Sequence, residues 1–213
     1  LKKKNRKMYA DTFGIKALNL AQRNKLDGIK IHSSDLNNKP LLEKLKDKKK
    51  KYFLSCGGST IEEIAYAVKI TNKNGIKPIL LHGFQAYPTH IEDTHLNRIS
   101  TLKNIFKGSC DYGYQDHISG DDPMNLTVSQ IALAYGANYI EKHVTLNRKE
   151  KGVDYYSSIE PSELKKFVYS IRQSEKSIGS SRIQFSSSEK KYRTEMKKFW
   201  ITKKKLKKNQ ILK

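Results

Sequence analysis

Cysteine, acidic residues and long apolar runs are all scarce in this chain of 213 residues. The two cysteines, Cys56 and Cys110, are too few for a disulfide-stabilised scaffold, and both stand in apolar, strand-like segments. We therefore expect reduced thiols in a protein core. No run approaches the roughly 18 apolar residues of a membrane span. Residues 1–14 lack the apolar core and small-residue cleavage site of a signal peptide. The sequence thus predicts a cytoplasmic protein without a membrane partner.

Acidic residues are outnumbered by basic ones, 21 against 42, which gives a formal net charge of +21. The lysines are concentrated in Lys2–Lys7, Lys44–Lys51 and Lys190–Lys208. Clustered cations can bind nucleic acid, but no strand-and-aromatic pattern of a nucleic-acid-binding module accompanies them. We interpret these clusters as solvated surfaces whose field would also attract a small anionic substrate. Nucleic acid is not an expected partner.

Short apolar runs alternate with amphipathic stretches from residue 8 to about residue 180. Helical spacing is clearest after Thr60, where Ile61, Ile64 and Val68 recur on one face and the first turn is acidic. Glycines follow several of these stretches, as they do at helix C-termini. The predicted strands are residues 8–10, 28–31, 52–55, 79–82, 112–114 and 139–144, and the predicted helices are residues 15–21, 40–48, 60–73, 96–106, 124–135 and 162–178.

Strands that alternate with helices predict parallel β/α units. Polar residues at the strand C-terminal ends favour an α/β fold of the TIM-type (β/α)8 barrel class, in which the loops after the strands carry the chemistry. An open doubly wound sheet is the competing architecture. With six strands, the barrel would lack its first two β/α units. We predict this incomplete barrel over residues 1–180, a linker over residues 181–195, and the start of another module over residues 196–213, with a strand at Phe199–Ile201.

Two histidines, His117 and His143, end the last two predicted strands. Neighbouring strands lie about 4.8 Å apart, so both imidazoles could reach one divalent ion and leave positions open for water and substrate. Each histidine could instead form a hydrogen bond within its own loop. Spacing alone leaves both interpretations open.

A second group of polar residues suits an anion. Lys30, Ser33 and Ser55 offer an ammonium group and two hydroxyl groups. Residues 57–60 would let backbone amides and a helix N-terminus approach a phosphate, although an ordinary helix cap after a glycine turn explains them equally well. The Tyr87-Pro88 pair indicates a fixed turn that presents Tyr87.

In these motifs the chain resembles the N-acetylneuraminate (sialic acid) synthase family, which condenses phosphoenolpyruvate (PEP) with a sugar aldehyde. The resemblance covers residues 28–180, and its segments occur in family order: GIKIHSSDLNNKPLLEKL, FLSCGGSTIEEI, ILLHGFQAYPTHIEDTHLNRISTL, GYQDHISGDD, GANYIEKHVTL and KGVDYYSSIEPSELKKFV. The later stretch EKKYRTEMKKFWITKKKLKKNQIL resembles the linker and the first strand of the family's C-terminal antifreeze-like domain. The resemblance implies a barrel that makes a sialic or other nonulosonic acid and releases phosphate.

The resemblance also implies roles for single residues and partners. His117 and His143 match the manganese-binding histidines, with Mg2+ or Co2+ as alternatives to Mn2+. The expected partners are PEP, the aldehyde of N-acetylmannosamine or a related amino or deoxy sugar, and a second copy of the chain in a homodimer. The implied catalytic residues are Glu141, Asp35 and Asp116, and the implied substrate-binding residues are Lys30, Ser33, Ser55, Gln85, Tyr87, Gln115 and Asp154.

Several departures from the family pattern surround the acceptor pocket. Gln85 stands where the family often has Asn, Gln115 where it commonly has Ser, and a GDDP insertion follows His117. The acceptor sugar therefore stays open. The family's first two β/α units and most of the antifreeze-like domain have no counterpart, so we expect a fragment that is inactive by itself. Two alternatives are a catalytically inactive barrel fragment that binds polyanions or nucleic acid, and an aldolase that uses Lys30 as a Schiff base.

Overall fold

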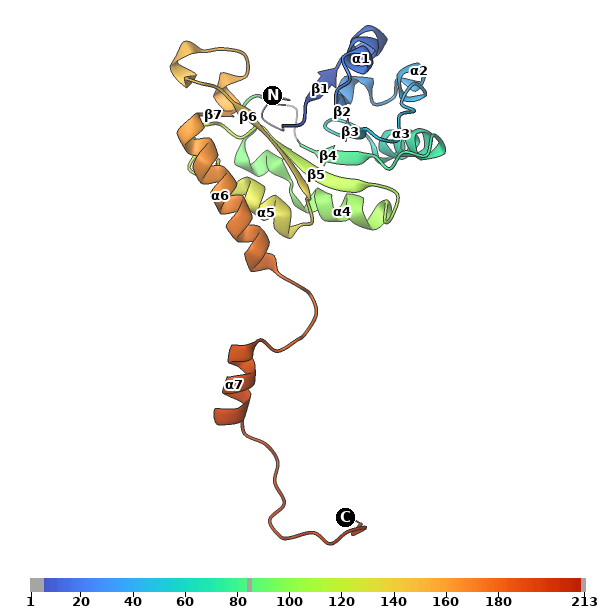
Figure 1. Ribbon diagram of the computed structural model, residues 1–213. Helices are drawn as coiled ribbons and strands as arrows, with labels where there is room; N and C mark the ends of the chain where they lie inside the picture. The colour runs from blue at the N-terminus through green and yellow to red at the C-terminus, as the bar shows by residue number, and fades with distance from the viewer. Residues whose placement is uncertain (1–5, 84–85, 212–213) are drawn as a thin grey trace. The chain divides into compact units, whose positions relative to one another are not determined.

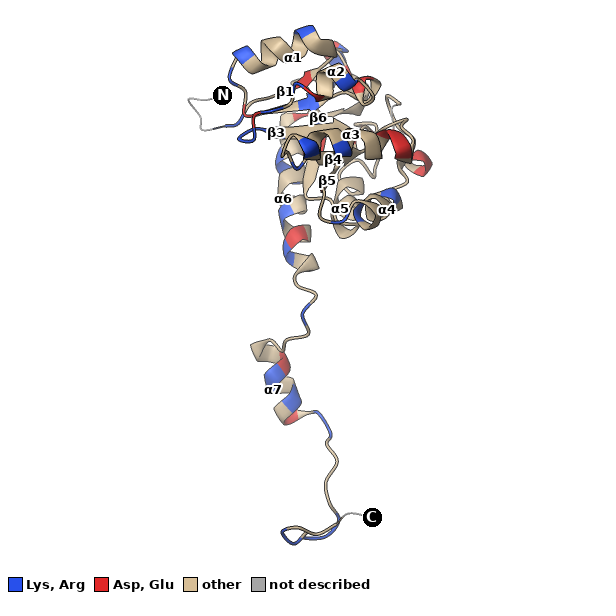
Figure 2. Cartoon of the chain, turned by 90° about the vertical axis from the view of Figure 1, so that its right-hand side faces the viewer, with Lys and Arg blue, Asp and Glu red and all other residues tan. Residues whose placement is uncertain are grey.

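The computed structural model describes residues 6–83 and 86–211. The described chain divides between Ile178 and Gly179 into two compact units. No helix in the described ranges is long and apolar enough to cross a membrane. Lys and Arg residues lie on many elements, including α1, α6 and α7, and are interspersed with acidic residues on the last two (Figure 2).

The first unit is built on one parallel sheet in which each strand pairs with the next along the chain (Figure 1). Among the described residues β1 pairs only with β2, and β7 only with β6, so the sheet is open. It is nevertheless curled, because side chains of β2 and β6 meet across its inner face. The sequential order excludes the doubly wound alternative, in which the strand order reverses. The strands are β1 (Tyr9–Thr12), β2 (Gly28–Ile31), β3 (Lys51–Ser55), β4 (Ile79–His82), β5 (Asp111–Asp116), β6 (Tyr139–Val144) and β7 (Ser158–Ile159).

The helices of this unit follow the strands and cover the outer face of the sheet (Figure 1). A capping box begins α3: the Glu63 amide donates to Thr60 Oγ1 (3.3 Å), and the Thr60 amide donates to Glu63 Oε2 (2.7 Å). Gly75, at φ +72°, ends the same helix. The helices are α1 (Gly14–Arg23), α2 (Lys39–Leu42), α3 (Ile61–Lys73), α4 (Asn97–Ile105), α5 (Val128–Ala134) and α6 (Pro161–Ile178), with short 3-10 helices at Ser33–Asp35, Ile91–Thr94, Arg148–Glu150 and Tyr155–Ser157.

The two faces of the sheet have different roles because side chains alternate along a strand. Residues such as Ile29, Leu54 and Leu80 are fully buried in the core between sheet and helices. Their neighbours Lys30 and Phe53 point to the inner, concave face. The outer face therefore stabilises the unit, and the inner face is free to carry chemistry.

Most of the predicted elements are confirmed, with shifted ends. All six predicted strands are present, and residues 112–114 are the middle of the longer β5. The structure adds β7, which the sequence did not predict; it pairs with β6 through His143 and Ser158. Cys56 and Cys110 are free and buried, as predicted. Burial raises the pKa of the Cys56 thiol to about 12, which keeps it protonated and unreactive.

The second unit contains a helix within the segment that we predicted to be a linker. Helix α7 (Ser187–Glu195) begins with a capping box between Ser186 and Glu189. The predicted strand at Phe199–Ile201 is wrong: these residues form no strand, and Trp200 is fully exposed. An isolated strand has no partner for its backbone groups, and this segment pairs with none of the described residues. That residues 196–213 begin another module stays a prediction.

Replacing Leu80 by alanine should lower the free energy of unfolding by about 2–5 kcal/mol, because it leaves a cavity in the core behind β4. Leu80 is 0% exposed, whereas Leu20 on α1 is 63% exposed. The matched variant Leu20→Ala should therefore change stability by no more than about 0.5 kcal/mol. Urea unfolding followed by circular dichroism measures both, and equal losses would contradict the assigned core.

Candidate active site

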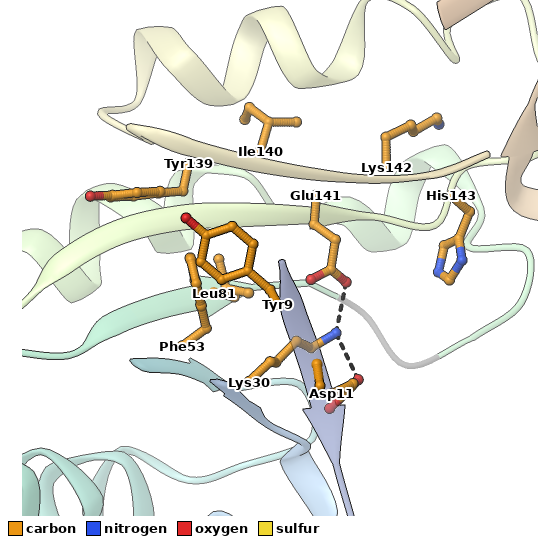
Figure 3. Close-up of a pocket in the computed structure, with 11 residues that line it drawn as sticks. Tyr9, Asp11, Lys30, Phe53, Leu81, Tyr139, Ile140, Glu141, Lys142 and His143 are labelled. Carbon is orange, nitrogen blue, oxygen red and sulfur yellow. Dashed lines mark hydrogen bonds and ion pairs between the residues drawn. The ribbon is translucent and has the colours of Figure 1, made fainter. Parts of the chain in front are cut away.

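Inward-facing side chains line a cavity of about 510 Å³ on the concave face of the sheet (Figure 3). Aromatic residues lie near the strand N-terminal ends, where the Phe53 ring stacks edge-on against Tyr9 and Tyr139 at centroid distances of 5.5 and 5.7 Å. Polar residues follow nearer the C-terminal ends, among them Lys30 and Glu141. The cavity thus has an apolar floor and a charged rim, at the end of the strands where β/α barrels carry their chemistry.

Lys30 lies between two carboxylates that come from opposite sides of the cavity. Its Nζ is 2.7 Å from Glu141 Oε1 on β6 and 3.1 Å from Asp11 Oδ2 on β1 (Figure 3). Burial alone would lower the pKa of Lys30, but Glu141 and then Asp11 outweigh it and raise the pKa above its ordinary value. Lys30 is therefore an ammonium group. A nucleophilic lysine must be neutral, so this environment does not favour the Schiff-base alternative.

Three side chains at the rim are arranged as a possible metal-binding group. Ligand atoms of His117, Glu141 and His143 all lie within 4.8 Å of one another, and the two imidazole centroids are 5.2 Å apart. Glu141 and His143 are two residues apart on β6 and so share its inner face. His117 directly follows β5. The prediction that the two histidines meet is confirmed, and Glu141 joins them.

The surroundings of His143 fit a divalent cation. Its Nε2 is buried and has no hydrogen-bond partner among the described residues, whereas its Nδ1 lies 3.8 Å from Asp154 Oδ2. A ligating histidine commonly presents one nitrogen to the metal while a carboxylate orients the other. Two imidazoles and one carboxylate are a donor set that transition-metal ions accept. The chain's own residues therefore suit such an ion.

Tyr87 lies beside the two histidines. Its ring centroid is 4.4 Å from that of His117 and 6.3 Å from that of His143. The Tyr87-Pro88 peptide bond is cis. Burial raises the pKa of the Tyr87 phenol, so it stays protonated and can donate a hydrogen bond. Gln85, which we expected on the same loop, lies outside the described residues.

Ser55 and Gln115 form a neutral pair on the inner face. Ser55 Oγ donates to Gln115 Oε1 (3.0 Å), and Gln115 Nε2 has no acceptor among the described residues. Ser33 begins the 3-10 helix that follows β2. Gln115 is the register partner of Glu141, so its amide N–H group lies on the same inner face and is suited to an oxygen of a bound anion.

Two of the predicted catalytic residues lie away from the cavity. Asp35 Oδ2 accepts from the Gly14 amide (2.6 Å), and its Oδ1 accepts from Asn38 Nδ2 (2.8 Å), so this carboxylate holds the start of α1. Asp116 is 0% exposed and faces α5, on the side of β5 opposite to Gln115. Neither residue lines the cavity.

Two features of the site were not predicted from the sequence. They are the contact of Asp11 with Lys30 and the place of Glu141 beside the two histidines. Asp11 was overlooked because the first strand was predicted to end at residue 10, two positions before its observed end at Thr12. Glu141 had a detectable signal: a residue two positions before a ligand on the same strand points to the same side.

A comparison with protein-family models matches residues 1–183 to the NeuB family. The chain is 37% identical over 216 residues to the uncharacterised protein MJ1065 of Methanocaldococcus jannaschii, covering 97% of this chain and 62% of that protein. It is 35% identical over 213 residues to the N,N'-diacetyllegionaminic acid synthase of Campylobacter jejuni, covering 99% of this chain and 62% of the synthase. The chain thus spans about 62% of the length of these two curated relatives.

Among solved structures, the chain is similar to the N-acetylneuraminic acid (sialic acid) synthetase of Leptospira borgpetersenii, crystallised in complex with citrate. The TM-score is 0.82 at 34% identity, and the match covers 92% of this chain and 67% of that protein.

Proposed function

This chain belongs to the NeuB family, and on that premise we propose that it carries the PEP-binding and metal-binding residues of a synthase that condenses PEP with a sugar aldehyde. The product would be a sialic or other nonulosonic acid. The observation that carries the proposal is the group formed by His117, Glu141 and His143 directly beside the ammonium group of Lys30. A metal-binding group next to a fixed cation suits a reaction between an anionic enol ester and an aldehyde.

His117, Glu141 and His143 would hold the divalent ion, and we propose Mn2+, with Mg2+ or Co2+ as alternatives. A bound ion of this kind would act as a Lewis acid toward the aldehyde oxygen. Asp154 Oδ2 lies 3.8 Å from His143 Nδ1, and this carboxylate would orient the imidazole so that Nε2 faces the ion. Tyr87, beside both histidines, is placed to donate a hydrogen bond to the acceptor sugar.

Lys30 would bind the anionic end of PEP, together with Ser33, Ser55 and Gln115. The Gln115 amide nitrogen, which has no acceptor within the described ranges, would donate to a PEP oxygen. Asp11 and Glu141 keep Lys30 charged and hold its Nζ at one place on the rim. An anion arriving there meets a cation whose side chain is already ordered, which reduces the entropy lost on binding.

In the proposed reaction C3 of PEP attacks the aldehyde carbon and a carbon–carbon bond forms. Water adds to C2, and cleavage of the C2–O bond releases inorganic phosphate. The alkoxide formed from the aldehyde takes up a proton. Glu141, at the junction of the cation and the histidines, is the residue we assign to positioning the water or moving its proton.

The acceptor sugar is proposed as a class: N-acetylmannosamine or a related amino or deoxy sugar. A curated relative is named a diacetyllegionaminic acid synthase, and the similar crystal structure is named a sialic acid synthetase. Different acceptors thus occur within the family. A homodimer in the cytoplasm belongs to the same proposal.

The test begins with binding. The chain should bind Mn2+, and PEP should then change the relaxation of water protons by the bound ion; EDTA should abolish both signals. Sugar aldehydes are next added with PEP labelled with 18O at the bridging oxygen, and any phosphate released should carry the label, because the C2–O bond breaks. Phosphate release without a sugar, or label retained in the organic product, would contradict the proposed reaction.

A further inference from the structure

A buried ion pair lies on the opposite face of the two strands that carry the metal-binding group. Lys142 Nζ is 3.0 Å from Asp116 Oδ1, and the two side chains are 3% and 0% exposed. Asp116 and Lys142 are direct register partners of the parallel β5–β6 pair. The pair therefore connects these strands at the level of the candidate site, from the helix-facing side.

Asp116 also connects two further segments, the loop after His117 and α5. Its Oδ1 accepts from the Ile118 amide (2.9 Å), in the loop that follows His117, and its Oδ2 accepts from Ser129 Oγ (2.7 Å) on α5. Both carboxylate oxygens of Asp116 thus accept a hydrogen bond, and the ammonium group of Lys142 forms an ion pair with Oδ1. The end of β5, the next loop, α5 and β6 all meet at this carboxylate.

Each member of the pair is next to metal-binding residues in the chain. Asp116 precedes His117, and Lys142 stands between Glu141 and His143. Consecutive strand residues point to opposite faces, so a side chain fixed behind the sheet fixes the backbone from which the next side chain projects inward. A shift of β5 against β6 would separate His117 from the other two residues.

Stability alone explains the pair poorly. The free energy needed to remove two charges from water can equal or exceed the free energy of their attraction. Well-packed apolar residues in the same place often stabilise a core equally well. The Lys142 Nζ has no hydrogen bond of good geometry within the described residues, so the pair does not reach the ideal arrangement that repays desolvation. What the pair does provide is one defined register for β5 and β6.

We propose that Asp116 and Lys142 are positioning residues that set the distance between His117 and the Glu141–His143 face, and hence the affinity and geometry of the metal site. This inference rests on the metal site of the proposed function. It places Asp116 on the helix-facing side of the sheet, behind that metal site.

The test measures metal binding instead of turnover. Co2+ is titrated into the wild-type chain and into Lys142→Met, whose unbranched side chain is one atom shorter and carries no charge. We expect an affinity about 10-fold to 100-fold lower and a changed visible absorption spectrum of Co2+, as for other residues that orient metal ligands. Lys142→Arg should restore most of the affinity. Lys39→Met, whose side chain is 59% exposed, is the matched control and should bind as the wild type does.

A second variant keeps the test decisive should Lys142→Met fail to fold. Ser129→Ala removes one hydrogen bond to Asp116 and should shift the Co2+ spectrum and weaken binding in the same direction, by a smaller factor. Folded Lys142→Met and Ser129→Ala proteins that bind Co2+ with wild-type affinity and spectrum would overturn the positioning role alone. A wild-type chain that binds no divalent ion would overturn the proposed metal site, and this inference with it.

Discussion

Replacing His143 by alanine should lower the affinity of the chain for Mn2+ or Co2+ by about 100-fold or more, beyond the loss typical of residues that only orient a ligand. His143 has a buried Nε2 without a hydrogen-bond partner among the described residues, and one of its ring nitrogens lies within 4.8 Å of the ligand atoms of His117 and Glu141. His117→Ala should have an effect of the same order. Isothermal titration calorimetry, or the electron paramagnetic resonance signal of free Mn2+, measures the affinity.

His90 provides the control for these variants. It is an exposed histidine outside the metal-binding group, and its side chain does not cap the 3-10 helix that it precedes. His90→Ala should bind the ion as tightly as the wild-type chain does. Unchanged affinity in both His117→Ala and His143→Ala would mean that the two imidazoles share no ion.

Replacing Lys30 by methionine should weaken PEP binding by about 100-fold, because truncating one partner of a buried charge pair costs about 2–5 kcal/mol of binding. The substitution removes the cation and also leaves Asp11 and Glu141 facing the cavity without it. The incoming anion would then meet two carboxylates. PEP binding is measured by calorimetry at a saturating Mn2+ concentration.

The double variant Lys30→Met/Asp11→Asn separates the two causes. Removing the Asp11 charge should recover part of the lost affinity if repulsion contributes, because the two residues are in contact and their effects are not additive. Lys39→Met is again the exposed lysine control. Wild-type PEP affinity in folded Lys30→Met would exclude Lys30 from the anion site.

The outer face of the fold was predictable because its signals are local. Three signals predict the helix after Thr60: apolar spacing, a capping box and a glycine at its end. All three lie within 16 residues of sequence (Thr60–Gly75). β7 gave no such signal, because a two-residue strand is too short to show alternation. The apolar triplet Phe199–Ile201 gave a false strand signal, because an apolar run forms a strand only where a neighbouring strand is available to pair with it.

Most residues of the candidate site could be predicted from the sequence, but the contacts between them could not. Lys30 and Glu141 were both identified, but they are 111 positions apart and nothing local shows that they touch. Asp116 was assigned to catalysis from the family resemblance, and it stands next to His117 in the chain. In a strand that adjacency means opposite faces, so strict alternation would have placed it behind the sheet. Asp11 was lost through an error of one or two residues in a strand boundary.

The contact between Lys30 and Glu141 also bears on how the chain acquires its binding ability. Closing a loop of that length is entropically costly, and such distant pairings form late in folding. No hairpin or single β/α unit contains both partners, so early folding species have no binding rim. A ligand held between β2 and β6 recognises only the finished fold and, by mass action, shifts the population toward it.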